Sequence, residues 1–258
     1  MKQSFTLLGL AAGSAAFLAT EARAQQGQPA PTPVVEIYQC TYRGTNDMDD
    51  LRAVTARFNT WADRNNMTNY TAFTATPYLF SPELEADVLW IGAWPNGTAM
   101  GADETRYLAE GGEISAAFDA VSDCSAHALY ASVVVNQPAA PPPQNGLAMF
   151  EDCTVRDGRT VPEAIAALEQ WAEYTKSRGS DAFSAMLFPL AGLGNDADYT
   201  FKLVTGFESM EAFGKGTDMY TGGGFLRAEE LLGRLLECNS ARVYALDRVR
   251  LATATPSG

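Results

Sequence analysis

The sequence predicts an α+β protein built from two tandem copies of a βαββαβ unit. The first observation is a repeated motif: Cys40-Thr41-Tyr42-Arg43 recurs as Cys153-Thr154-Val155-Arg156, each time directly after an apolar, strand-like stretch. The second is that each copy carries a further cysteine, Cys124 or Cys238, before a matching strand-like segment. The third is the Pro-rich segment 136–146, whose composition is typical of a linker between the copies. Such internal repetition indicates a duplicated structural unit.

The spacing of apolar residues predicts the order of elements in each copy. A capping pattern at 46–49 and a capping box at 160–163 mark the first helix of each copy, and Pro162 suits the first turn. In the first copy we expect strands at 34–43, 70–80, 88–94 and 127–135, with a second helix at 113–123. In the second copy we expect strands from 147 and at 181–190, 199–207 and 241–249, with a second helix at 225–237.

The N-terminus has the features of an export signal. Lys2 gives a short positive segment, an apolar run covers 7–18, and Ala22-Arg23-Ala24 fits a cleavage site. No later segment has 18 consecutive apolar residues, so we expect no membrane span. We therefore expect a bacterial protein located in the periplasm or secreted.

These features divide the chain into six parts. They are a signal peptide (1–24), a linker (25–33), the first repeat (34–135), the Pro-rich linker (136–146), the second repeat (147–250) and a tail (251–258).

Composition excludes several classes of function. The chain has 258 residues, with 18 Lys and Arg against 31 Asp and Glu, and its net charge is −13. Such a surface repels phosphate backbones, so we expect no nucleic-acid partner. His127 is the only histidine, which argues against a His-cluster metal site and a Ser-His-Asp triad. We expect no metal and no cofactor.

A βαββαβ unit leaves one apolar sheet face that must be buried, and a second copy in the same chain can bury it. In this the chain resembles tandem ferredoxin-like units forming an intramolecular dimeric α/β barrel, which implies a monomer. The second copy also resembles the antibiotic-biosynthesis-monooxygenase superfamily, because Gly206-Phe207-Glu208-Ser209-Met210-Glu211-Ala212-Phe213 follows its third strand. Members of this family usually have a His in or near the helix that follows the third strand. The corresponding segments of this sequence, 98–104 and 212–217, contain no His. Any activity of this type would therefore depend on Trp, Tyr or Asn side chains.

The four cysteines are expected to form two disulfides, since exported proteins favour them. Four cysteines allow three pairings. The duplication selects Cys40–Cys124 and Cys153–Cys238, because each copy then carries the same bond. In a βαββαβ sheet the end of the first strand also lies beside the start of the fourth.

Seven residues are candidates for ligand binding. Arg43 and Arg156 occupy matching positions and could bind an anion, or lie exposed at a strand–helix turn beside an Asp. The others are aromatic and could line a cavity between sheet and helices, or pack in the core. They are Trp90, Trp94, Tyr130, Phe201 and Tyr244.

Three other features allow two interpretations. His127 could act as an acid or base, or lie at a strand end. Its counterpart in the second copy is Ala241. His127 does not fit the role of a proximal haem ligand, because such a ligand is expected on a helix. Lys202 lies in mid-strand, where the first copy has Ile91, and could mark an asymmetric site or an open sheet edge. The acidic cluster at 47–50 is interpreted as helix capping rather than a Ca²⁺ loop.

Our main expectation is an exported, non-catalytic module that binds a small molecule, and therefore not an enzyme. The first alternative is a cofactor-independent oxygenase or isomerase of the antibiotic-biosynthesis-monooxygenase type. The second is a structural or interaction protein without a small-molecule site.

Overall fold

A computed structural model describes residues 32–81, 84–194 and 197–253. The chain divides into two units, Met1–Pro31 and Thr32–Gly258, and only the second is described below. The expected signal peptide (1–24), most of the linker (25–33) and the end of the tail (251–258) lie outside the described residues.

The protein belongs to the predicted α+β class. Its first half contains β1 (Val34–Tyr42), α1 (Met48–Arg64), β2 (Thr71–Leu79), β3 (Val88–Trp94), α2 (Gly97–Glu110), α3 (Gly112–Val121) and β4 (Ser122–Asn136). Its second half contains β5 (Asn145–Val155), α4 (Val161–Ser177), β6 (Phe183–Ala191), β7 (Phe201–Phe207), α5 (Met210–Met219), the π-helical turn η1 (Tyr220–Gly224), α6 (Phe225–Leu232), β8 (Leu236–Cys238) and β9 (Arg242–Arg250).

Eight strands close into one antiparallel barrel. Their order is β7-β6-β4-β1-β3-β2-β9-β5, and β5 pairs with β7 to complete the ring. The short β8 pairs with the end of β5 outside this ring. Within each half the order is the same, β4-β1-β3-β2 and β9-β5-β7-β6. The halves join where β4 pairs with β6 and β2 pairs with β9.

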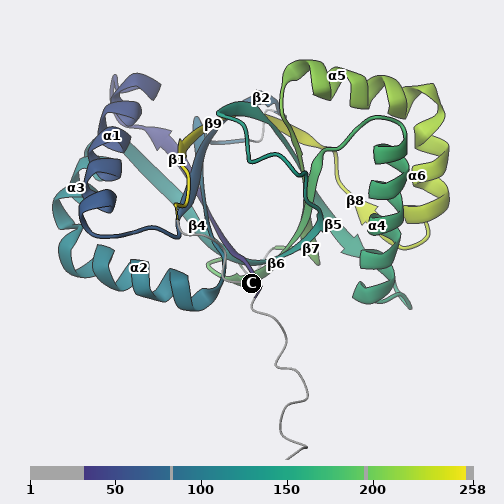
Figure 1. The fold of residues 1–258 in the computed structure, drawn as a ribbon, viewed down its shortest axis with the longest axis horizontal. Helices are drawn as coiled ribbons and strands as arrows, with labels where there is room; N and C mark the ends of the chain where they lie inside the picture. The colour runs from purple at the N-terminus through teal and green to yellow at the C-terminus, as the bar shows by residue number, and fades with distance from the viewer. Residues whose placement is uncertain (1–31, 82–83, 195–196, 254–258) are drawn as a thin grey trace, which may run out of the picture. The chain divides into compact units, whose positions relative to one another are not determined.

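The helices lie outside the barrel in two groups. Figure 1 shows α1, α2 and α3 against one side of the barrel and α4, α5 and α6 against the other. The capping box expected at 160–163 is present at α4, formed by Thr160 and Glu163. At α1 the box is formed by Asp47 and Asp50, one residue later than the expected 46–49. Within the described residues, none of the helices combines the length and the apolar character that crossing a membrane requires.

The structure adds helices and shifts boundaries that the sequence pattern did not predict. Helices α2 and α5 follow β3 and β7 directly, because the side chains of Asn96 and Ser209 accept hydrogen bonds from the first turns. The helix expected at 225–237 ends at Leu232, and β8 follows it. Strand β4 starts at Ser122 rather than at 127, since 122–124 continue the pairing with β1.

Apolar side chains form separate cores inside and outside the barrel. The barrel interior contains side chains from both halves, including Val35, Ala75, Tyr130, Phe150 and Tyr244. The outer cores lie between the sheet and the helices of each half. Because successive side chains of a strand point to opposite faces of the sheet, each strand contributes alternate residues to the barrel interior and to the core beneath the helices.

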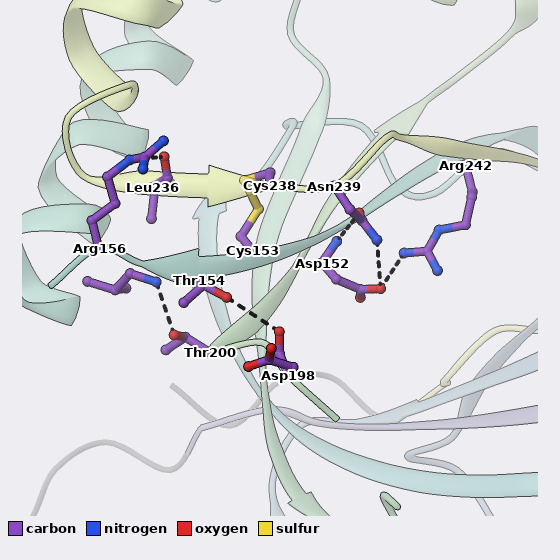
Figure 2. Close-up of a disulfide and its surroundings, with 11 residues drawn as sticks. Asp152, Cys153, Thr154, Arg156, Asp198, Thr200, Leu236, Cys238, Asn239 and Arg242 are labelled. Carbon is purple, nitrogen blue, oxygen red and sulfur yellow. Dashed lines mark hydrogen bonds and ion pairs between the residues drawn. A yellow bond between two sulfur atoms is a disulfide. The ribbon is translucent and has the colours of Figure 1, made fainter. Parts of the chain in front are cut away.

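Two disulfides join the first strand of each half to a neighbouring strand. They are Cys40–Cys124 and Cys153–Cys238, and both pairs are direct cross-strand partners. Figure 2 shows the second bond between β5 and β8. The pairs agree with the spacing of the cysteines in the two copies.

Peptide mapping tests this pairing in solution. Non-reducing digestion should yield Cys40 linked to Cys124 and Cys153 linked to Cys238, because each pair is held in register by its strands. A peptide linking a cysteine of one half to a cysteine of the other would contradict the structure. Removing either bond should lower the free energy of unfolding by about 2–5 kcal/mol, as measured by denaturant titration.

Candidate functional site

A large cavity lies in the second half. It has a volume of about 750 Å³ and lies between the barrel sheet and helices α4, α5 and α6. We call it the second-half cavity. This size lies in the range of pockets that hold organic ligands. Its apolar wall includes Leu168, Trp171, Leu203, Phe207, Phe213 and Leu232.

Strand alternation aims a carboxyl group into this cavity. On β5, Met149 and Glu151 line the cavity, whereas Phe150 belongs to the barrel core. Thr205 on β7 and Ser184 on β6 add hydroxyl groups to the same wall. The sheet therefore supplies an acidic and polar floor, and the helices supply an apolar cover.

The helical wall is bent at a glycine-rich turn. Gly222, Gly223 and Gly224 lie in η1, between α5 and α6, and Gly223 has φ 119°, which side-chain-bearing residues rarely adopt. Tyr220 and Leu226, on either side of the turn, line the cavity and are 48% and 64% exposed. This wall therefore presents apolar side chains both to the cavity and to solvent.

Glu151 is placed in surroundings that disfavour its charge. Burial raises the pKa of the Glu151 carboxyl, and only the charge of Arg242 acts in the opposite direction. Glu229 also lines the cavity, but among the lining residues that the structure describes there is no Lys, Arg or His. A carboxyl with a raised pKa in an apolar cavity is a suitable general base near neutral pH.

The described residues of the first half are packed differently beneath their helices. The corresponding region holds a packed aromatic cluster, in which Trp61, Trp90 and Phe118 surround Phe58. Buried Trp94 completes this core and donates to Asp103 at 3.2 Å. In the described residues the two halves therefore differ here: aromatic rings fill this space in the first half, and the second half holds the cavity.

A chain of hydrogen bonds crosses the first-half core. Trp90 Nε1 donates to Tyr70 Oη at 2.6 Å, and Tyr70 donates to Glu36 Oε1 at 2.6 Å. His127 Nε2 lies 3.0 Å from Glu36 Oε2. Gly92 is required here, because a Cβ at this position would lie 2.2 Å from Tyr70 Oη. This series of hydrogen bonds gives each of these polar side chains a partner within a packed core.

The seven predicted ligand residues lie in separate places. Tyr130 and Tyr244 line the barrel interior, whereas Trp90, Trp94 and Phe201 pack outside it. Arg43 donates to the Ser122 carbonyl and pairs with Asp123. Arg156 donates to the Gly233 and Leu236 carbonyls and pairs with Glu237, as Figure 2 shows in part. The structure does not bring the seven together, and none lines the second-half cavity.

Sequence reasoning missed the residues that line this cavity. Glu151 had a detectable signal, because it is a charged residue within an apolar first strand whose first-copy counterpart is Tyr38. Trp171 and Tyr220 were not among the residues predicted to bind a ligand. A cavity forms where no large side chain fills the space between packed elements. A single sequence does not show which spaces stay unfilled.

Comparisons with solved structures show which known proteins have a similar fold. No family model matches the chain, and no curated protein matches its sequence. Three solved structures cover most of it. A provisionally assigned monooxygenase from Fusobacterium nucleatum has 8% identity and a TM-score of 0.57, covering 85% of this chain and 94% of that one. The chain shares the dimeric α+β-barrel fold.

The other two structures have slightly lower TM-scores than the first. A provisionally assigned monooxygenase from Lactobacillus acidophilus has 13% identity and a TM-score of 0.53, covering 86% of this chain and 96% of that one. A provisionally assigned chlorite dismutase has 10% identity and a TM-score of 0.53, covering 85% and 96%. At such identities the likeness concerns the barrel fold itself.

These comparisons correct the main functional expectation. A non-catalytic binding module was expected, but the solved proteins of this fold are described as monooxygenases and as a chlorite dismutase, which are enzymes. The expectation of a non-enzyme is therefore not supported. The findings agree better with the alternative of an oxygenase or isomerase.

The second-half cavity does not fit haem. A haem needs an axial ligand and benefits from cations beside its propionates. Among the described lining residues there is no His, and Cys238 is bound in a disulfide, so only Met149, Met219 or Tyr220 could ligate iron. The described lining has no Lys or Arg that could pair with the propionates. His127 lies in the first half, stacked on Tyr38 and bonded to Glu36. The acids Glu151 and Glu229 would repel propionates, so we derive no step through haem.

The first-half core predicts a pH dependence of stability. Burial, and then the charge of Glu36, raise the pKa of Glu104 on α2 to about 7, while His127 opposes the shift. The folded state therefore holds more protons than the unfolded state between pH 4.5 and 7, and stability falls as pH rises through this window.

Glu104→Gln should remove this dependence. Because the side chain is partly exposed, we expect a gain of about 1 kcal/mol in the free energy of unfolding at pH 8 and none at pH 4. Denaturant titrations at both pH values measure it. Glu110→Gln, exposed at the end of the same helix, is the control. Equal effects of the two variants would refute the assignment.

Proposed function

We propose that the second-half cavity is the active site of a cofactor-independent oxygenase, with Glu151 as its general base. The observation that carries the proposal is a half-buried carboxyl of raised pKa in a cavity of about 750 Å³, whose described lining holds no cation. Such a site favours a neutral, apolar substrate that carries one acidic proton. An aromatic molecule with a phenolic hydroxyl or an activated CH₂ group meets these conditions.

The reaction begins with proton transfer to Glu151. Loss of the proton leaves an electron-rich phenolate or carbanion, which can reduce O₂ directly, so the substrate is its own reductant. For an activated CH₂ group, two hydrogens leave and one oxygen atom enters to give a carbonyl, while the second oxygen atom leaves as water. Thr205 and Ser184 are placed on the same floor to hydrogen-bond the substrate oxygen.

The rest of the site supports this use. Trp171 and Phe213 provide flat apolar walls for aromatic rings, and the lack of Lys and Arg in the described lining disfavours anionic substrates. Two of the compared structures are provisionally assigned as monooxygenases, which supports this proposal. The argument for this chain nevertheless comes from Glu151 and the cavity.

Three further proposals concern the whole chain. We infer that its halves are ferredoxin-like repeats of one duplicated unit, which is supported by their equal strand orders and matching disulfides. Because the barrel is closed within one chain, we propose a monomer. The two disulfides support export to the periplasm or the exterior.

Oxygen uptake with a substrate panel tests the proposed activity. Hydroquinones, naphthols and anthrones are incubated with the protein under O₂, and incorporation of ¹⁸O from ¹⁸O₂ is followed by mass spectrometry. We expect turnover whose rate rises with pH, with a midpoint above 4.5, the ordinary pKa of a Glu carboxyl. Glu151→Gln should lower kcat by about 100-fold or more.

The control is Glu173→Gln, on the exposed face of α4. It should leave kcat unchanged. Proton exchange of the substrate with solvent but no O₂ uptake, lost in Glu151→Gln, would favour an isomerase instead. Equal rates in Glu151→Gln and the wild type would refute Glu151 as the base.

A further inference from the structure

A second, smaller cavity lies inside the barrel. It has a volume of about 290 Å³ and is lined by residues of both halves. Gln39, which directly precedes Cys40, lines it, so the cavity lies near the disulfide-bearing ends of the strands. Its described lining includes three tyrosines, Tyr130, Tyr199 and Tyr244, and two cations, Lys202 and Arg242.

The two cations share one carboxylate. Asp152 on β5 accepts hydrogen bonds from Lys202 and, at 2.6 Å, from Arg242. Figure 2 shows Arg242 and Asn239 both directed at the Asp152 carboxylate. The side chains of Lys202 and Arg242 are only 18% and 24% exposed. This cluster therefore carries two positive charges against one negative charge, in partial isolation from water.

Hydrogen-bond donors outnumber acceptors in this cluster. Both Asp152 oxygens are already engaged by Lys202, Arg242 and Asn239. Arg242 Nε is buried and has no acceptor within the described part of the chain, and a Lys ammonium has three donors in total. Burial lowers the pKa of Lys202, whereas Asp152 opposes this effect. An anion in the cavity would satisfy these donors and balance the charge.

The first half shows that the fold does not require these charges. In the sheet register Cys40 pairs with Val88 and Cys153 pairs with Phe201, so Lys202 corresponds to Leu89 and not, as the sequence pattern suggested, to Ile91. By the same register, Gln39 and Ala128 stand where the second half has Asp152 and Arg242. These first-half residues line the same cavity without forming an ion cluster.

Stability does not explain the cluster either. A buried ion pair is often no more stabilising than apolar residues of similar volume. The first half has the uncharged residues Gln39, Leu89 and Ala128 at the corresponding positions. A charged cluster confined to one half of a duplicated barrel, beside a cavity, therefore indicates a ligand.

We propose that the barrel cavity binds a small organic carboxylate. The carboxylate accepts hydrogen bonds from Lys202 and Arg242, and its apolar body packs against Leu89, Phe150 and Tyr244. The volume of about 290 Å³ limits the ligand to about the size of benzoate. This site lies on the opposite side of the sheet from Glu151 and does not depend on the proposed oxygenase activity.

Calorimetric titration with benzoate tests the site. The wild type should bind one benzoate saturably, with a Kd of about 1 mM or lower, while benzyl alcohol, which has no charge, should not bind. The triple variant Asp152→Gln, Lys202→Leu, Arg242→Ala carries the first-half residues at all three positions. It should fold, as judged by circular dichroism, and lose at least 10-fold in affinity.

Asp152→Gln alone tests the charge argument in the opposite direction. It frees both cations, so benzoate should bind at least 10-fold more tightly and raise the Tm of this variant more than that of the wild type. The control Glu173→Gln, on the exposed face of α4, should bind benzoate as the wild type does. No saturable binding to folded wild type would overturn the proposal, as would equal binding of chloride or sulfate, or unchanged binding in the triple variant.

Discussion

The closed ring of backbone hydrogen bonds is the constraint on which the rest of this structure depends. Each half alone would end in two open strand edges, β4 and β2 in the first half and β9 and β6 in the second. Pairing β4 with β6 and β2 with β9 removes all four edges within one chain. Closure fixes which side chains point into the barrel and which point to the helices. It thereby creates separate inner and outer spaces that can evolve independently.

The outer spaces of the two halves are packed differently. In the first half, Phe58 contacts five other aromatic rings, and the chain from Trp90 to Glu36 satisfies the polar groups among them. In the second half, helices α5 and α6 are separated by the glycine-rich turn η1, and a cavity remains. The filled half stabilises the barrel, so the second half can tolerate a poorly packed region. This difference in packing explains why the candidate active site of the described structure lies in the second half.

The sequence predicted what depends on local pattern and on repetition. The capping box at Thr160, the α+β class and the pairing of cysteines within each half follow from residues near one another or from comparison of the two halves. The box at α1 begins at Asp47, one residue after the expected start. The cavity could not be predicted, because it depends on the absence of a side chain in three dimensions. The candidate aromatic residues illustrate this: strand alternation placed Trp90 and Trp94 on one face, but it did not show that Phe58 and Tyr70 fill the space before them. Lys202 was noticed as unusual, yet its partner Asp152 lies on another strand.

One strand links the two proposed sites. Glu151 and Asp152 are adjacent on β5, and their side chains point to opposite faces of the sheet, Glu151 into the second-half cavity and Asp152 towards the cations beside the barrel cavity. Arg242 acts on both: it donates to Asp152, and its charge opposes the rise in the pKa of Glu151. An anion bound beside Arg242 would partly cancel this charge and make Glu151 a stronger base. The occupancy of the barrel would then tune proton transfer in the outer cavity through electrostatics, without any movement of the backbone.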